Sequence, residues 1–186
     1  MSLTNVRALT LPLDRDVLKT LHAGDVCTLT GTLFTLRDAG HMRLLAEMDE
    51  AHSDELPYGL AGQAIFYAGP TPAAAGRPFG AIGPTTASRM DFAAARLYRA
   101  GICATIGKGH RNQEVIDACV ETGSVYFVAV GGAAAYLAKC VTDAQVIAYD
   151  DLGTEALRRI EVVDFPVFVG VDCQGEDVYR LAVEEA

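Results

Sequence analysis

Positive charge is scarce in this sequence. Lysine and arginine number 15 against 24 aspartates and glutamates, which gives a formal net charge of −9 over 186 residues. A surface this acidic argues against general binding of nucleic acid and against docking on an anionic membrane. If the protein binds an anion, the positive charge that holds the anion must be concentrated locally.

Long apolar runs are also missing. No stretch approaches the roughly 20 apolar residues that cross a bilayer, and the longest smooth run, Val125–Leu137, is interrupted by Gly131 and Gly132. The N-terminal segment acquires acidic side chains early and has no apolar core of the kind found in secretory signals. We therefore expect no membrane span and no secretory leader, and we expect a cytoplasmic protein.

Paired cysteine motifs are absent as well. The five cysteines are odd in number and none is arranged as CxxC; they are Cys27, Cys103, Cys119, Cys140 and Cys173. This pattern favours reduced thiols in the cytoplasm over a disulfide framework or a zinc site. We expect the chain to carry no metal centre of its own.

What the sequence does contain is enough apolar material for one core. Hydrophobic residues make up 51% of the chain, and the length suits one domain better than two. The first third is β-rich, with strand patterns over 25–30, 32–36 and 63–67. Asp38 is expected to cap a helix over 39–50.

Three units of strand, glycine-containing turn and helix follow. Strands are expected at 79–83, 102–106 and 124–130, and helices at 88–100, 113–121 and 133–141. The tail adds strands at 146–149 and 168–171 and a hairpin turn at 172–175. Such units are typical of a parallel or mixed sheet. The sequence thus predicts one α/β domain over 1–186, with a β-rich N-terminal part packed on a βα core.

The segment GPTTASRMD (83–91) is the strongest candidate for a binding site. Backbone N–H groups at the start of a helix bind anions, and the hydroxyls of Thr85 and Thr86 can add hydrogen bonds. Arg89 opposes the helix dipole in the first turn, which is reasonable if an anion binds there. The alternative is that a hydroxyl caps the helix and Arg89 pairs with Asp91 or faces solvent.

Two other turns carry positive charge. Glycines on both sides of Lys108 allow close approach of a ligand, although the spacing is not that of a P-loop and a surface lysine is the simpler interpretation. If this turn and that at 83–86 follow neighbouring parallel strands, both open on the same sheet edge. Arg37 and His41 lie four residues apart on a helix start, and His41 is either an acid–base group or a structural histidine.

Three turns thus place Arg37, Arg89 and Lys108 in an otherwise acidic chain. Two arginines can hold a dicarboxylate at both ends. The sequence has no pair of acids, Ser-His-Asp order or metal-ligand cluster at these turns. It therefore indicates a domain that binds a small polyanion and is poorly equipped to transform it unaided.

At these same residues the sequence resembles the β subunit, or C-terminal domain, of the iron–sulfur hydro-lyases of the class I fumarase and L-tartrate dehydratase type. The resemblance covers most of the chain in order, and its segments are 24–41, 63–70, 83–91, 106–112, 130–139 and 164–175. It implies a single swivelling β/β/α domain. It also implies a separate α subunit, in a heterodimer or an α2β2 assembly, that binds a [4Fe–4S] cluster, so that this chain holds no metal.

The resemblance further implies reversible hydration of fumarate to malate, or loss of water from tartrate. Position by position, Thr85 and Lys108 match catalytic residues, and Arg37 and Arg89 match the arginines that bind the substrate carboxylates. Thr86 and His41 are assigned supporting roles in substrate binding. RMD at 89–91 favours fumarate over tartrate.

Two other functional classes remain open from the residues. The chain could be a non-catalytic dicarboxylate-binding regulatory module, which should bind a dicarboxylate tightly alone. It could also be a self-sufficient lyase using His41, which should hydrate substrate without oxygen or chelator sensitivity.

Overall fold

The computed structural model describes residues 6–73 and 76–184. Residues 1–5, where we expected no secretory signal, lie outside these ranges. The chain is a mixed α/β structure, which confirms the predicted class. Within the described ranges, no helix is long and apolar enough to cross a membrane.

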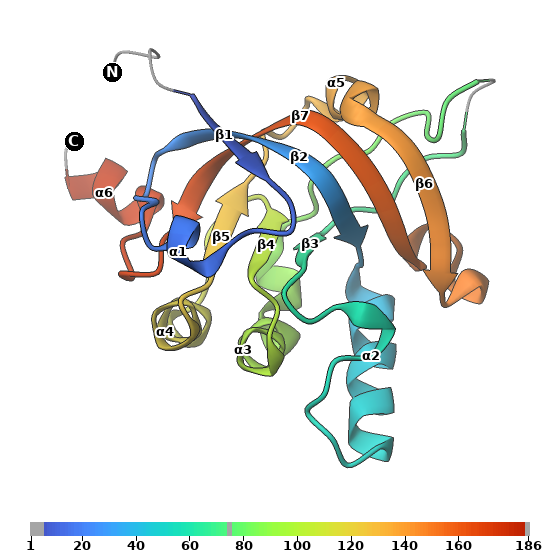
Figure 1. Ribbon diagram of the computed structural model, residues 1–186, viewed down its shortest axis with the longest axis horizontal. Helices are drawn as coiled ribbons and strands as arrows, with labels where there is room; N and C mark the ends of the chain where they lie inside the picture. The colour runs from blue at the N-terminus through green and yellow to red at the C-terminus, as the bar shows by residue number, and fades with distance from the viewer. Residues whose placement is uncertain (1–5, 74–75, 185–186) are drawn as a thin grey trace.

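Seven strands form one sheet. Their order is β1 (Arg7–Thr10), β2 (Val26–Thr35), β3 (Ala64–Phe66), β4 (Ala104–Gly107), β5 (Val125–Val128), β7 (Leu157–Val171) and β6 (Val141–Ala148). Strands β1 to β5 are parallel to their neighbours, whereas β7 is antiparallel to β2, β5 and β6. Because β7 pairs with both β5 and β2, the strands β2-β3-β4-β5-β7 close into a ring. The β-rich first third and the later βα units thus belong to the same sheet (Figure 1).

Helices cover one side of this ring. The helices are α1 (Arg15–Leu18), α2 (Asp38–Glu50), α3 (Asp91–Ala100), α4 (Gln113–Thr122), α5 (Ala134–Leu137) and α6 (Val178–Glu184), and the 3₁₀ turns are η1 (Pro57–Gly59), η2 (Ala87–Met90), η3 (Ala138–Cys140) and η4 (Asp150–Glu155). In Figure 1, α2, α3 and α4 lie together on one side of the strands. The alternation of side chains along each strand therefore separates two apolar clusters.

One cluster fills the ring and the other lies under the helices. Phe66 and Phe127 belong to the interior of the ring, whereas their chain neighbours Tyr67 and Tyr126 face the helices. All four side chains are fully buried. Burial of such a side chain contributes about 1.5–3 kcal/mol, so both faces of the sheet stabilise the positions of the turns at its ends.

The second and third predicted strands are confirmed, but the first is wrong. Residues 79–83 form no strand; Gly80 and Ala81 form backbone hydrogen bonds with 71–72, and Pro84 forms an isolated bridge with Ala68. Phe79 and Ile82 are apolar because they pack into the ring cluster. Apolar content alone did not distinguish a core-facing loop from a strand.

The tail also differs from its prediction. β7 extends over 15 residues, whereas a strand was expected only at 168–171. Pro166 within β7 cannot donate a backbone hydrogen bond. The pairing of β7 with β6 ends at Val162, and its pairing with β5 begins at Phe168. Pro166 lies between these two paired parts, where neither strand requires its donor. The predicted third helix, 133–141, is one turn of α-helix, α5, that continues into the 3₁₀ turn η3. The predicted hairpin turn at 172–175 is present and is closed by a Val171–Asp177 bridge.

The start of α2 is capped differently from the prediction. Arg37 is the N-cap residue and makes no side-chain capping bond. The carboxylate of Glu155, from η4, accepts the hydrogen bond of the Ala39 N–H at 2.7 Å. Asp38 is instead the first residue of the helix, where a negative charge is favoured by the helix dipole.

Candidate functional site

The predicted turns meet at one edge of the sheet. The Thr85 N–H donates to the Tyr67 carbonyl at 2.7 Å, and the Lys108 N–H donates to the Thr85 carbonyl at 3.1 Å. The Ala87 N–H then donates to the Lys108 carbonyl at 2.8 Å. The segment 84–87 therefore lies between the ends of β3 and β4. The two turns thus lie at the same edge, although the turn at 83–86 does not follow a strand, as the expectation had required.

Two arginines approach one carboxylate at this edge. Nε of Arg89 donates to Oδ1 of Asp38 at 2.8 Å, and Nε of Arg37 lies 3.6 Å from Oδ2 of Asp38. Arg37 also places Nη2 3.6 Å from Oε1 of Glu155. Within the described residues, Nε of Arg37 and Oδ2 of Asp38 complete no hydrogen bond although both are buried. The two guanidinium groups can thus flank a carboxylate and retain unused hydrogen-bonding capacity.

The simpler interpretation of Arg89 holds only in part, because its side chain is half exposed to solvent but does not pair with Asp91. Arg89 pairs with Asp38 rather than with Asp91, and neither Thr86 nor another side chain caps the turn η2. The partner of Asp91 is Arg111, whose Nε donates to Oδ1 at 2.8 Å. The charge of Arg89 is therefore directed toward α2 and not toward its own helix.

Glycines leave space for the cationic side chains. A Cβ atom on Gly69 would lie 3.0 Å from both Cδ and Nη1 of Arg37 and 3.1 Å from the Thr154 carbonyl oxygen. A Cβ atom on Gly131 would lie 3.7 Å from Cδ of Lys108. The turns after β3 and β5 thus lie against Arg37 and Lys108, respectively.

The candidate residues differ in exposure. Lys108 and Thr86 are exposed, Thr85 is partly buried, and the Arg89 side chain is half exposed at 50%. Arg37 is more enclosed, with 23% of its side chain exposed. The edge therefore offers guanidinium, ammonium and hydroxyl groups from neighbouring turns, which is the chemistry that binds a small polyanion.

His41 lies behind this edge and not on it. It is fully buried, and burial lowers the pKa of its imidazole to about 4. Its Nδ1 lies 2.8 Å from the Arg37 carbonyl oxygen, so Nδ1 carries the proton and donates. Nε2 has no partner among the described residues. A neutral, enclosed imidazole acts on a ligand only through Arg37.

The sequence reasoning missed the buried groups below the edge. Arg111 is 5% exposed, and its guanidinium carbon lies 5.4 Å from the ring centroid of Tyr67 and 4.9 Å from that of Tyr126. Cations interact favourably with aromatic faces at such distances. The Asn112 N–H also donates to Asp91, at 2.9 Å. These contacts join the segment that carries Arg89 to the one that carries Lys108.

The cysteines do not provide the donors of an iron–sulfur cluster. Such clusters are held by several thiolates together, whereas burial raises the pKa of the Cys27 and Cys119 thiols to about 12 and that of Cys103 to about 11. Among the described residues, no group of three or more ligand-type side chains includes a cysteine. The residues of this chain therefore do not fit a [4Fe–4S] cluster.

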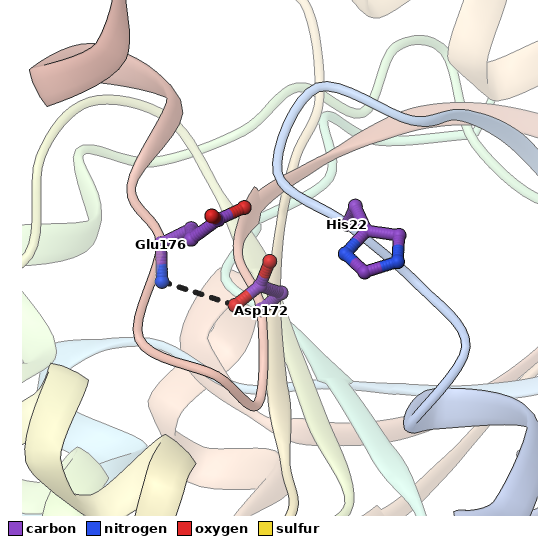
Figure 2. A group of neighbouring side chains, drawn as sticks. All are labelled: His22, Asp172 and Glu176. Carbon is purple, nitrogen blue, oxygen red and sulfur yellow. Dashed lines mark hydrogen bonds between the residues drawn. The ribbon is translucent and has the colours of Figure 1, made fainter.

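A cluster of His22, Asp172 and Glu176 lies elsewhere, at the turn after β7 (Figure 2). The buried Asp172 carboxylate accepts hydrogen bonds from the backbone N–H groups of Gln174 at 2.9 Å, Glu176 at 3.0 Å and Ala23 at 3.0 Å. Asp172 thus organises its own turn and joins it to the segment before β2.

The fold and this edge define an α/β domain with cationic side chains on turns at one sheet edge. Residues 3–182 match the family described as "Fumarase C-terminus", and the chain belongs to this family. The resemblance inferred from the motifs is thereby confirmed.

Curated relatives agree with this assignment. The chain is 41% identical over 160 residues to "Fumarate hydratase class I, anaerobic" of Escherichia coli, covering 85% of this chain and 29% of the relative. It is 38% identical over 184 residues to "Fumarate hydratase 2" of Leishmania major, covering 96% and 32%, respectively. The match to "Putative L(+)-tartrate dehydratase subunit beta" of Methanocaldococcus jannaschii is 32% identical over 168 residues and covers 87% and 85%. The chain thus spans about a third of the two fumarate hydratases and most of the tartrate dehydratase subunit.

Proposed function

We propose that the chain is the β subunit of a two-subunit iron–sulfur hydro-lyase that hydrates fumarate to malate and reverses this reaction. The observation that carries the proposal is the placement of Arg37, Arg89 and Lys108 on neighbouring turns of one sheet edge, in a member of the Fumarase C-terminus family. An acidic chain that concentrates cations in this way is suited to a dicarboxylate.

The relatives support a partner polypeptide. The matched region is about a third of each of the two fumarate hydratases but 85% of the Methanocaldococcus subunit, so this domain has a precedent as a separate chain. We assign the remaining part of the enzyme to an α subunit, in a heterodimer or an α2β2 assembly. Because the cysteines of this chain do not suit a [4Fe–4S] cluster, we assign the cluster to that partner.

In this proposal, the residues of the chain bind and orient the substrate. Arg37 and Arg89 bind the substrate carboxylates, and a carboxylate of the substrate takes the place that Asp38 occupies between them. Lys108 contributes its ammonium to the same pocket. We assign proton transfer to the hydroxyl of Thr85 and a further hydrogen bond to the substrate to Thr86. A threonine hydroxyl is a weak base alone, so its role depends on the cations around it.

His41 supports Arg37 by holding its carbonyl oxygen. The whole chain, 1–186, acts as one swivelling β/β/α domain that closes the site against the partner subunit. The reduced state of the cysteines, all of which are free, supports a cytoplasmic location.

A second candidate substrate is L(+)-tartrate. The observation that favours it is the match to the Methanocaldococcus subunit, of which 85% is covered. The higher identity to the fumarate hydratases, 41% and 38% against 32%, favours fumarate.

The proposal is tested by anaerobic purification of the tagged chain from its native host, identification of the co-eluting protein, and assays with fumarate and tartrate. A brown partner at equal stoichiometry with oxygen-labile fumarate hydration is expected. Activity on tartrate alone would change the substrate. A colourless chain that elutes alone and binds a dicarboxylate tightly would indicate the regulatory module instead.

One substitution tests the carboxylate contact directly. Arg89→Ala is expected to cost about 2–5 kcal/mol of transition-state stabilisation in kcat/KM, as for a truncated charge contact with a buried ligand. Arg99→Ala is the matched control, because Arg99 lies at the other end of α3 and pairs with Glu121. Activity of Arg89→Ala within a few-fold of that of the control would refute the carboxylate contact.

A further inference from the structure

The backbone of the Lys108 turn is held by two tyrosine hydroxyls. The Gly109 carbonyl accepts a hydrogen bond from the Tyr126 hydroxyl at 2.9 Å, and the Gly109 N–H donates to the Tyr179 hydroxyl at 3.1 Å. Gly109 has φ +82°, a conformation that favours glycine, and it has no side chain of its own to anchor the turn. The two hydroxyls, from β5 and α6, therefore restrain the peptide groups that follow Lys108.

Tyr126 is itself held rigidly. It is fully buried, and its ring lies against Gly170 of β7, where an added Cβ atom would be only 2.9 Å from Cδ1 and 3.0 Å from Cε1. A second neighbour is Arg111, whose guanidinium carbon lies 4.9 Å from the ring centroid. Burial raises the pKa of Tyr126, so its hydroxyl keeps its proton and remains a donor to Gly109.

Arg111 connects this support to the arginine side of the site. Its Nε donates to Asp91 at 2.8 Å, two residues after Arg89, with 0% and 10% of the two side chains exposed. Lys108 itself is exposed, so the direction of its stem depends on the backbone of the turn. The buried support and the exposed cations thus form one connected unit.

We propose that Tyr126 is a positioning residue for Lys108: its hydroxyl fixes the Gly109 peptide and thereby directs the Lys108 ammonium at the substrate. This inference rests on the proposed function, because it gives Lys108 a dicarboxylate to bind. Small displacements of a binding group cost large factors in rate when the geometry is otherwise preorganised. The hydroxyl of Tyr126 acts on the reaction only through Lys108.

The test compares two buried hydroxyls in the complex with the partner subunit. Tyr126→Phe is expected to lower kcat/KM about tenfold or more. Tyr98→Phe is the matched control, since Tyr98 is equally buried and its hydroxyl forms hydrogen bonds with Thr105 Oγ1 at 2.6 Å and with the Val125 carbonyl at 3.4 Å, and not with Gly109. It is expected to change kcat/KM less than about twofold.

A double-mutant cycle separates positioning from general loss of stability. In a Lys108→Met background, Tyr126→Phe is expected to have little further effect on kcat/KM, because the group that it positions is gone. An undiminished tenfold effect in that background would overturn the proposal. So would equal effects of Tyr126→Phe and Tyr98→Phe.

Amide hydrogen exchange provides a readout that does not depend on activity. The peptide spanning 107–112 is expected to exchange faster in Tyr126→Phe than in Tyr98→Phe and wild type. Unchanged exchange would overturn the proposal even in an active enzyme. If the wild-type complex is inactive on dicarboxylates but amide exchange in Tyr126→Phe changes as expected, the assignment of the substrate is wrong, whereas the support of the Lys108 turn by Tyr126 is confirmed.

Discussion

The buried ion pair between Asp91 and Arg111 makes a strong prediction about stability. Nε of Arg111 lies 2.8 Å from Oδ1 of Asp91, and 0% and 10% of their side chains are exposed. The other carboxylate oxygen accepts from the Asn112 N–H at 2.9 Å. Asp91→Asn keeps the size of the side chain but removes its charge and replaces one acceptor by a donor. Arg111 then remains charged and buried without a counter-ion.

The expected cost follows from this enclosure. Breaking a buried pair by removing one partner costs about 3–5 kcal/mol, and the midpoint of thermal unfolding falls by about 2–4 °C per kcal/mol for a protein of this size. The midpoint should therefore fall by about 6–20 °C. The Arg43–Asp151 pair offers a matched control, because its atoms are as close, at 2.6 Å, but its side chains are 39% and 65% exposed. Asp151→Asn should change the stability little, because water screens this exposed pair.

Chemical denaturation of both variants and of wild type measures these free energies. The reasoning requires the cost of Asp91→Asn to exceed that of Asp151→Asn by at least about 2 kcal/mol. Equal costs would refute it, since they would mean that Arg111 is adequately solvated without Asp91. A loss of kcat/KM in Asp91→Asn at a temperature where it is fully folded would show that the pair also orients the turns at the site.

Three further predictions concern the pH dependence, the space beside Arg37 and the cysteines. Burial lowers the pKa of His41 from 6.5 to about 4, so between these pH values the unfolded chain binds a proton that the folded chain does not bind. The free energy of unfolding should therefore fall by up to about 3 kcal/mol as the pH drops from 6.5 to 4. His41→Asn should reduce the slope of this pH dependence by about one proton, and an unchanged slope in urea titrations would contradict the prediction. Gly69→Ala would put a Cβ atom 3.0 Å from the Arg37 side chain and should lower kcat/KM about tenfold by displacing that guanidinium. Gly62→Ala is the control, because the added atom meets nothing within 4 Å. It should leave kcat/KM near the wild-type value despite the unfavourable φ of this position. Cys27→Ser and Cys103→Ser should leave the iron content of the purified complex unchanged; loss of iron with folding preserved would assign the cluster to this chain.

The meeting of the turns at one edge was predictable only in part. A glycine-containing turn after an apolar strand marks the carboxyl end of a parallel strand, and such ends share an edge. The Lys108 turn follows β4 and obeys this rule, whereas the Thr85 turn follows a loop and reaches the edge through backbone hydrogen bonds to Tyr67 and Lys108. Among the 15 lysines and arginines, Arg37, Arg89 and Lys108 were selected because they lie at these turns.

The buried support below the edge was not predictable, because its signal is not local. Asp91 and Arg111 are 20 residues apart, and their pairing depends on how α3 packs beside the end of β4. Tyr126 looks like any apolar strand residue until its hydroxyl is seen to contact Gly109. The prediction of a strand at 79–83 was wrong for a related reason, since a loop whose apolar side chains face the core has the composition of a strand.

The closure of the ring by β7 also orders events during synthesis. The residues assigned to the site, 37–108, leave the ribosome well before β7, which begins at Leu157 and pairs with both β2 and β5. A nascent chain therefore carries every assigned site residue while the long edge of β2 still lacks its antiparallel partner. We therefore expect the sheet edge that carries the assigned site to form only after β7 has been synthesised, and a product truncated before Leu157 to leave this edge of β2 unpaired.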